Sequence, residues 1–380
     1  MKLMHLSDLH LGKRLMDVSL LEDQRYILDQ IVQIAEEERP QAVLIAGDVY
    51  DRSNPSAEAM TLFAGFLHRL AVPGRTVLVI SGNHDSSERV AYLGELVRER
   101  GVCLSPVYEG HIEPVCLRDE NGEVRFYLMP YIHPEAARRY FPEAEIANAN
   151  DAARIVLEEM DPDPSCRNVE LSHQFISDSA FDDPDQRAVG TLDCVDASLY
   201  EAFDYVALGH IHRPQAAGRA DGTMRYCGSP LKYSRREAAV QKSVTLVDLG
   251  PKGDVRQWQR PLKPLREVHA VRGAFDDLIE QGPEAGTEKD WFFITLTDEE
   301  DIANASAQLR QRFGRVLALD YDNARTRAGG SILPGRAEAE QKQPIELLME
   351  LYRAMHHAEM SEEALAFAER AMRETEGFDE

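Results

Sequence analysis

The chain has 380 residues, of which 43% are hydrophobic and 28% charged, and its formal net charge is 42 minus 66, or -24. This length allows two or three domains, and the composition is that of a soluble globular protein, which excludes a fibrous or largely disordered chain. Such an acidic balance also argues against a generally basic surface of the kind that holds nucleic acid through its phosphates.

The longest apolar runs, such as 77–80, have the length of strands, and residues 1–5 lead straight into a polar motif. We therefore expect a cytoplasmic protein with no membrane span and no leader. The five cysteines are scattered and include no Cys-x-x-Cys pair, so we expect buried thiols and no zinc or redox site.

The first hundred residues predict alternating strands and helices. In chain order we expect strand 2–6, helix 21–38, strand 42–46, a helix opened by Asn54 and Pro55, strand 76–80 and helix 88–100. The helix opened by Pro55 has an apolar stripe that we expect in the core, although part of it could form a dimer contact. That stripe consists of Met60, Phe63, Phe66, Leu67 and Leu70. In helix 88–100 we expect four side chains to face inward, namely Val90, Leu93, Leu96 and Val97, with Gly101 as a left-handed cap.

The pattern then changes to shorter alternating stretches, which indicate a second sheet. A hairpin is expected around Asn121 and Gly122. The further elements, in order, are strands 112–117 and 124–129, helices 134–139 and 151–160, strand 169–171, an acidic loop at 177–196, and strands 203–208 and 243–249.

Pro261 and Pro264 mark a domain boundary, after which a small α/β unit is expected. Its elements are strand 266–271, helix 274–281, strand 291–297, helix 301–313 and strand 315–321. Glycines and prolines at 329–335 predict a linker, and the tail from Pro344 has the spacing of two amphipathic helices. These helices could pack back on the body or bind a partner protein. The expected parts of the chain are therefore 1–262, 263–330 and 331–380.

Five segments end, directly after apolar runs, in side chains that can bind a metal. They are Asp8 with His10, Asp48, Asn83 with His84, His173, and His210 with His212. Each segment alone is weak, since a carboxylate or imidazole after a strand is commonly a cap or a surface residue. Five of them at strand ends predict one crevice. Carboxylate, imidazole and amide ligands without thiolate suit manganese, iron or magnesium better than a closed structural zinc site.

A two-metal site needs a bridging carboxylate, and Asp48 is the natural candidate. We expect His212 to join Asp8 and His10 on one ion, and His210 to join Asn83 and His173 on the other. His84 is then left over and is suited to protonate a leaving oxygen or to stabilise transition-state charge. It lies between Asp51 and Asp85 in sequence, and of these we expect Asp51 to orient its ring.

This ordered set of residues resembles the calcineurin-like metallophosphoesterases. The set comprises Asp8-x-His10, Gly47-Asp48, Gly82-Asn83-His84-Asp85, His173 and Gly209-His210-x-His212. The resemblance implies an α/β sandwich of two mixed β-sheets flanked by helices, and it agrees with the ligand division and with the role given to His84. The expected site therefore has seven metal ligands, with His84, Asp51 and Asp85 as catalytic candidates.

Within that superfamily, residues 6–12, 172–175 and 228–234 look like a family of bacterial DNA-repair nuclease subunits. The resemblance implies manganese-dependent cleavage of DNA, exonucleolytic from 3′ ends of duplexes and endonucleolytic on single strands or hairpins. It also implies a nuclease domain at 1–262, a DNA-selecting capping domain at 263–330, a homodimer, and an ATPase partner whose coiled coil binds the tail helices. Basic residues close to the site in sequence soften the objection from net charge, namely Arg52, Arg213, Lys232, Arg235 and Arg236.

Two other functions compete with this one. A different member of the superfamily could hydrolyse cyclic nucleotides or phosphoproteins, but neither task needs the unit after 265 or the tail helices. A scaffold protein could keep the fold without the chemistry, but such a protein should lack ligands, and here all seven and His84 are present.

Overall fold

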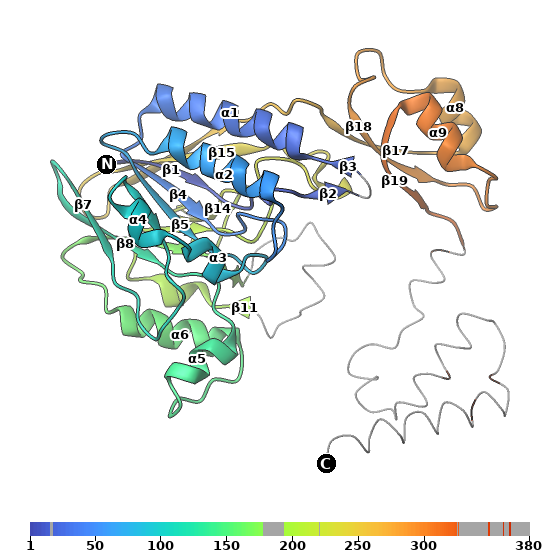
Figure 1. Ribbon diagram of the computed structural model, residues 1–380. Coiled ribbons are helices and arrows are strands. Elements are labelled where there is room, and N and C mark those ends of the chain that lie inside the picture. The colour runs from blue at the N-terminus through green and yellow to red at the C-terminus, as the bar shows by residue number, and fades with distance from the viewer. Residues whose placement is uncertain are drawn as a thin grey trace. The chain divides into compact units, whose positions relative to one another are not determined.

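The computed structural model describes residues 1–15, 18–177, 194–219 and 221–324, and positions 326, 349, 360 and 365. It divides into two compact units, one of residues Met1–Ala270 with Lys289–Phe292 and one of Val271–Glu288 with Phe293–Glu380 (Figure 1). Most of the expected acidic loop and of the tail helices lies outside the described residues. Within the described residues, no helix is long and apolar enough to cross a membrane.

The first sheet of the larger unit has six strands. In order across the sheet they are β16 (Val255–Pro261), β15 (Ser243–Leu249), β1 (Lys2–Leu6), β4 (Ala42–Ala46), β5 (Thr76–Ile80) and β6 (Val102–Leu104). The last four run parallel, while β15 and β16 pair antiparallel with their neighbours. Every residue of β4 is buried, as expected of a central parallel strand covered on both faces.

The second sheet also has six strands and is also mixed. Its order is β13 (Gln215–Ala216), β14 (Met224–Tyr226), β12 (Tyr205–Leu208), β9 (Arg167–Ser172), β8 (Gly122–Leu128) and β7 (Val115–Asp119). The middle strands β14, β12, β9 and β8 are parallel to one another. The predicted hairpin is β7 with β8, in which Asp119 pairs with Gly122.

The two sheets pack face to face through alternate apolar side chains. Leu44 and Leu78 of the first sheet belong to one buried cluster with Phe126 and Leu171 of the second. In Figure 1, helices α1 (Leu21–Glu38) and α2 (Ala57–Leu70) lie along the first sheet. The predicted sandwich of two mixed sheets flanked by helices is confirmed.

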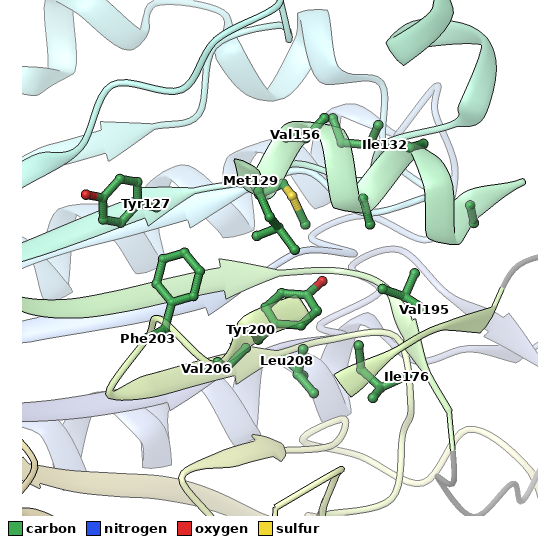
Figure 2. Packing of buried hydrophobic residues seen from close by; sticks show 14 of the residues in the cluster. Tyr127, Met129, Ile132, Val156, Ile176, Val195, Tyr200, Phe203, Val206 and Leu208 are labelled. Carbon is green, nitrogen blue, oxygen red and sulfur yellow. The ribbon is translucent and has the colours of Figure 1, made fainter. Parts of the chain in front are cut away.

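A second cluster fills the outer face of the second sheet. Helix α6 (Ala149–Met160) contributes Val156, which lies near Met129 in Figure 2, and the aromatic rings of Tyr200 and Phe203 belong to the same cluster. The shorter elements of this unit are strand pairs β2 (Arg14–Leu15) with β3 (Val18–Ser19) and β10 (Phe175–Ile176) with β11 (Cys194–Val195), helices α3 (Ser87–Ala91), α4 (Gly94–Arg98) and α5 (Pro134–Tyr140), and 3-10 turns η2 (Ala197–Tyr200) and η3 (Arg235–Glu237).

The smaller unit contains most of the predicted α/β element series. A three-stranded sheet has the order β17 (Val268–Gly273), β18 (Trp291–Leu296) and β19 (Arg315–Tyr321), with helices α8 (Phe275–Gln281) and α9 (Ala305–Phe313). Leu309 and Phe313 of α9 are buried, which gives this unit a core of its own.

Three sequence expectations are wrong. Helix α2 begins at Ala57 with the Ser56 side chain as its N-cap, so Asn54 and Pro55 precede the helix and do not open it. Helix 88–100 is broken into α3 and α4, because Tyr92 is extended and Leu93 adopts a left-handed conformation with φ of 63°. The turn leaves Leu93 and Leu96 50% and 68% exposed, although their spacing assigned them to the core. The cysteines are also not uniformly buried, since only Cys227 is, while Cys116 is exposed.

The carboxyl group of Glu170 on β9 is fully buried, and among the described residues neither of its oxygens has a hydrogen-bond partner. Burial raises its pKa well above the usual value, so folding favours the protonated form. As pH rises from the unfolded value near 4.3 towards the raised folded pKa, the unfolded chain ionises while the folded chain resists, and stability falls.

We therefore expect Glu170→Gln to gain stability relative to the wild type as pH rises, by about 1.4 kcal/mol per pH unit between the two pKa values. Urea unfolding of metal-stripped protein at pH 5 and pH 8 measures this difference. Glu120→Gln, at an exposed position of the hairpin, is the control. A stability difference that does not change with pH would contradict the prediction.

Candidate metal centre

All five predicted segments lie directly after parallel strands, three in one sheet and two in the other. Asp8 and His10 follow β1, Asp48 follows β4, Asn83 and His84 follow β5, His173 follows β9, and His210 and His212 follow β12. Because parallel strands end at the same edge of a sheet, the chain delivers these side chains to one place.

The backbone is strained at four of these positions. The φ angles of Asp8, His10, Asp48 and His210 are 53°, 45°, 50° and 102°, values that side-chain-bearing residues rarely adopt. Hydrogen bonds between the loops hold this conformation, since the Asp8 amide donates to the Gly47 carbonyl at 3.0 Å and the His10 amide to the Asp48 carbonyl at 2.9 Å. Strain held by surrounding contacts is typical of functional sites.

Gly209 permits the close approach of the two sheets at this edge. A Cβ at this position would lie 1.8 Å from the Ala46 carbonyl oxygen and 2.6 Å from Nδ1 of His173. No side chain fits there, so the glycine before His210 is a steric requirement of the site.

The first group of donors contains Asp8, His10 and His212, whose ligand atoms lie within 4.8 Å of one another. Nε2 of His10 is 3.0 Å from Nε2 of His212. The Asp8 carboxylate is fully buried, accepts a hydrogen bond from the Ser7 hydroxyl, and accepts another from the His210 amide at 3.0 Å. The side chains that the sequence assigned to one ion are therefore adjacent.

The second group contains His173, Asn83 and His210. The amide oxygen of Asn83 lies 3.1 Å from Nε2 of His173 and 3.1 Å from Nδ1 of His210. Nδ1 of His173 lies 2.8 Å from the Ala46 carbonyl, which can only accept, so this nitrogen is the donor. That hydrogen bond directs Nε2 of His173 towards the other donors.

The Asp48 carboxylate lies between the two groups. Its Oδ2 is 3.5 Å from Nε2 of His10 and 3.4 Å from Nε2 of His173. Burial favours the neutral carboxyl, but His173 and His10 hold the pKa of Asp48 well below its usual value. In return, Asp48 outweighs the effect of burial on the imidazole and raises the pKa of His173 to about 9. Elsewhere in the centre burial has the opposite effect, since it lowers the pKa of His10 well below its usual value and that of His210 to about 3.

These residues fit a pair of divalent cations. Two buried carboxylates, Asp8 and Asp48, would repel each other without positive charge between them. The donors are oxygens and imidazole nitrogens, and the described groupings contain no thiolate, which suits Mg²⁺, Mn²⁺ or Fe²⁺.

The His84 side chain is exposed, as is that of Asn83, whereas the other proposed ligands are buried or half-buried. The His84 amide donates to Oδ1 of Asp48 at 3.0 Å, and the ring Nδ1 of His84 lies 3.1 Å from the backbone carbonyl of Asp51. The Asp51 carboxylate instead accepts from Lys13 Nζ at 2.7 Å. The sequence pointed to Asp51 as the group that orients the ring, and the structure places its main chain, and not its side chain, in that position.

Asp85 does not contact the His84 ring in any described interaction. Its carboxylate accepts hydrogen bonds from the amides of Val49, Tyr50 and Gly82 at 2.9 to 3.0 Å. It thus joins the loop after β4 to the loop after β5. A nitrogen of the His84 ring lies within 4.8 Å of ligand atoms of His10 and Asp48, so these three side chains also form a grouping that could hold a metal ion.

Comparisons with known proteins bear on this site. Residues 1–214 match the family model of the calcineurin-like phosphoesterases. Over 323 residues the chain is 32% identical to a curated protein of Staphylococcus epidermidis that is named as the D subunit of the nuclease SbcCD, covering 84% of this chain and 85% of that one. This chain belongs to the SbcD family of calcineurin-like phosphoesterases. The family resemblance inferred from the motifs is confirmed, and the chain is a hydrolytic phosphoesterase that uses divalent metal ions.

Two further matches concern the end of the chain and the fold. Residues 261–356 match a family model described as the type 5 capsule protein repressor C-terminal domain. A solved structure of a dimetal phosphatase from Danio rerio is 15% identical, with a TM-score of 0.44, and covers 68% of this chain and 96% of that one.

The sequence analysis did not identify the side chains that hold the loop after β1, residues 7–12, in place. Gln24 of α1 donates to the His10 carbonyl at 2.7 Å and accepts from the Gly12 amide at 3.0 Å. The Tyr233 hydroxyl donates to the Leu9 carbonyl at 2.6 Å. In the sequence, the only indication of a role for Gln24 is that it interrupts an apolar helix stripe. The only indication for Tyr233 is its position in the 228–234 motif.

Proposed function

We propose that this chain is the nuclease subunit of a DNA-repair complex, which hydrolyses DNA phosphodiesters with two divalent ions. The observation that carries the proposal is the Asp48 carboxylate between two complete donor groups, 3.5 Å from His10 and 3.4 Å from His173. DNA is proposed as the substrate because the relative that matches 84% of the chain is named a nuclease. The proposed activities are 3′–5′ exonuclease on duplexes and endonuclease on single strands or hairpins.

In this proposal each ion has its own donors and shares Asp48. One ion would be held by Asp8, His10 and His212, and the other by Asn83, His173 and His210. When bound, the ions polarise the phosphodiester and lower the pKa of the attacking water. Mn²⁺ is proposed because it accepts this mixture of carboxylate, imidazole and amide donors.

His84 is the proposed catalytic residue of the chain. Its exposed ring can reach a substrate phosphate, and its Nδ1 is held by the Asp51 carbonyl, so the opposite nitrogen is free to face the leaving oxygen. Asp51 and Asp85 act in this proposal as positioning residues, through the main chain of one and the amide contacts of the other.

Two of the basic residues named from the sequence differ in whether their side chains are available to contact DNA. Lys232 is largely buried and donates to the Ala238 carbonyl and the Glu267 carboxylate, both at 2.6 Å, so it is a structural residue. The Arg52 side chain is 76% exposed and adjoins Asp51, which leaves it suited to contact a phosphate beside the site.

Hydrolysis of labelled duplex and single-stranded DNA by the purified chain with Mn²⁺, with and without chelator, tests the proposal. A cyclic nucleotide and a phosphopeptide are assayed in parallel. Metal-dependent loss of DNA supports the nuclease function. Activity on the cyclic nucleotide or the phosphopeptide alone would be consistent with the proposed metal centre but would contradict DNA as the substrate. A protein that takes up metal but cleaves none of these substrates would favour a scaffold.

For the assembly we propose a cytoplasmic homodimer that binds an SbcC-type ATPase through the tail helices. The apolar side chains of Met60, Tyr92 and Leu96 are 41%, 69% and 68% exposed, and their exposure supports a contact with a second copy. A chain ending at residue 340 should keep its nuclease activity on short DNA but no longer co-purify with the ATPase. Sedimentation of the full chain tests the dimer. Undiminished co-purification of the shortened chain would contradict the proposal that the tail binds the ATPase. A purely monomeric full chain would contradict the proposed dimer.

A further inference from the structure

A buried ion pair lies beside the centre and takes no part in the proposed chemistry. Glu237 and Lys242 are 1% and 3% exposed, and the Glu237 carboxylate contacts the Lys242 ammonium directly. The Ser234 hydroxyl also donates to Oε1 of Glu237 at 2.9 Å, and Lys242 donates to the Ser229 hydroxyl at 2.9 Å. Both charged groups are thus buried and hydrogen-bonded to side chains of the 228–242 segment.

Both members of the pair contact the same residue, His212. Oε1 of Glu237 lies 3.5 Å from Nδ1 of the His212 ring, and Lys242 Nζ donates to the His212 carbonyl at 2.8 Å. The Ser229 amide donates to that carbonyl as well, at 3.1 Å. The ring and the main chain of one proposed ligand are therefore both held by this segment.

Stability does not explain this pair. Moving two charges out of water costs several kcal/mol per ion, and a buried pair is often no more stable than apolar residues of the same volume. A carboxylate facing the outer nitrogen of a metal-binding imidazole, in contrast, fixes the tautomer and points the inner nitrogen at the metal. In His212 the inner nitrogen is Nε2, which lies 3.0 Å from Nε2 of His10.

The proposed ligands are not all held in this way. Nδ1 of His173 is held by the main-chain carbonyl of Ala46, so no side-chain substitution removes that contact. None of the proposed ligands of the second ion makes a described contact with Glu237. A substitution of Glu237 should therefore weaken the binding of one ion and leave the binding of the other unchanged.

We propose that Glu237 and Lys242 are positioning residues that fix the His212 ring and thereby set the affinity of the ion held by Asp8, His10 and His212. The inference rests on the proposed two-ion function. It gives the 228–242 segment a role at one of the two ions.

Mn²⁺ binding to metal-stripped full-length protein, followed by calorimetry and electron paramagnetic resonance, tests the inference. In Glu237→Gln we expect one Mn²⁺ to bind about 10- to 100-fold more weakly while the other is unchanged. At a Mn²⁺ concentration that fills both sites of the wild type, the spectrum of a coupled pair should change to that of a single ion.

Glu267→Gln is the matched control, because Glu267 also pairs with a lysine of this segment, Lys232, but contacts no proposed ligand. It should bind both ions as the wild type does. If Glu237→Gln does not fold, the double variant Glu237→Gln with Lys242→Met removes both charges and leaves no unpaired buried cation, and the same loss of one ion is expected.

Wild-type affinity for both ions in the Glu237 variant would overturn the inference. Equal weakening of both ions, or the same loss in the Glu267 control, would also overturn it, because a general structural role has that effect. A wild type that binds no metal would instead remove the proposed function on which the inference rests.

Discussion

Replacing His84 by glutamine should abolish DNA cleavage and leave both metal ions bound. The ring is exposed, while the second donor group is complete without it, since Asn83 lies 3.1 Å from both His173 and His210. Loss of a group that transfers a proton or stabilises charge in the transition state lowers kcat by about 10²- to 10⁴-fold. Glutamine retains the backbone amide that donates to Asp48, so the loop should keep its conformation.

Single-turnover assays measure the loss of DNA cleavage, and the Mn²⁺ stoichiometry of the same protein samples shows whether both ions remain bound. His68→Gln, at an exposed position on α2, is the control for a general effect of losing a histidine. Because the His84 ring lies near His10 and Asp48, the alternative is that it is a ligand. Loss of one Mn²⁺ from the His84 variant would establish that alternative and contradict the catalytic role.

The second large effect is expected from Asp48→Asn. Asp48 is the only carboxylate of the described centre that lies within 3.5 Å of a histidine from each donor group, so its charge serves both ions. Loss of a group that merely orients a ligand costs about 10- to 100-fold in affinity, and loss of a shared ligand should exceed this for each ion. Asparagine keeps an oxygen to accept from the His84 amide, so the change removes charge more than shape.

Calorimetric titration with Mn²⁺ should show both sites weakened by more than about 100-fold, with no measurable cleavage at metal concentrations that saturate the wild type. Asp29→Asn, on the exposed surface of α1, controls for the loss of one acidic charge. If one ion still binds with wild-type affinity, Asp48 is not the bridge. This result also differs from that expected of Glu237→Gln, which should affect a single ion.

The strongest sequence predictions concerned central strands. The runs at 42–46 and 76–80 are apolar on both faces, and only a buried parallel strand accommodates such a run, so both were found at the expected positions. The helix at 88–100 failed because helical spacing shows only that side chains could share a face. It does not show that any neighbour covers that face, and Leu93 and Leu96 are exposed.

The sequence by itself determined the types of donor at the centre and, through the resemblance that these motifs carry, the sandwich. Chemically distinctive side chains at the ends of apolar runs remain recognisable without coordinates, because strand ends are where a parallel sheet presents them. The order of those motifs along the chain was enough to assign the family, without any distance between their side chains.

Only the tertiary structure decided how those side chains are held. Asp51 acts on His84 through a carbonyl, which every residue has and which therefore leaves no trace in the sequence. Gln24 and the Glu237–Lys242 pair reach the centre from distant or irregular segments. Glu170 is buried with no hydrogen-bond partner in the part of the chain that the structure describes, and the sequence of its strand gave no sign of this. Such contacts depend on which segments fold side by side, and local periodicity carries no information about that.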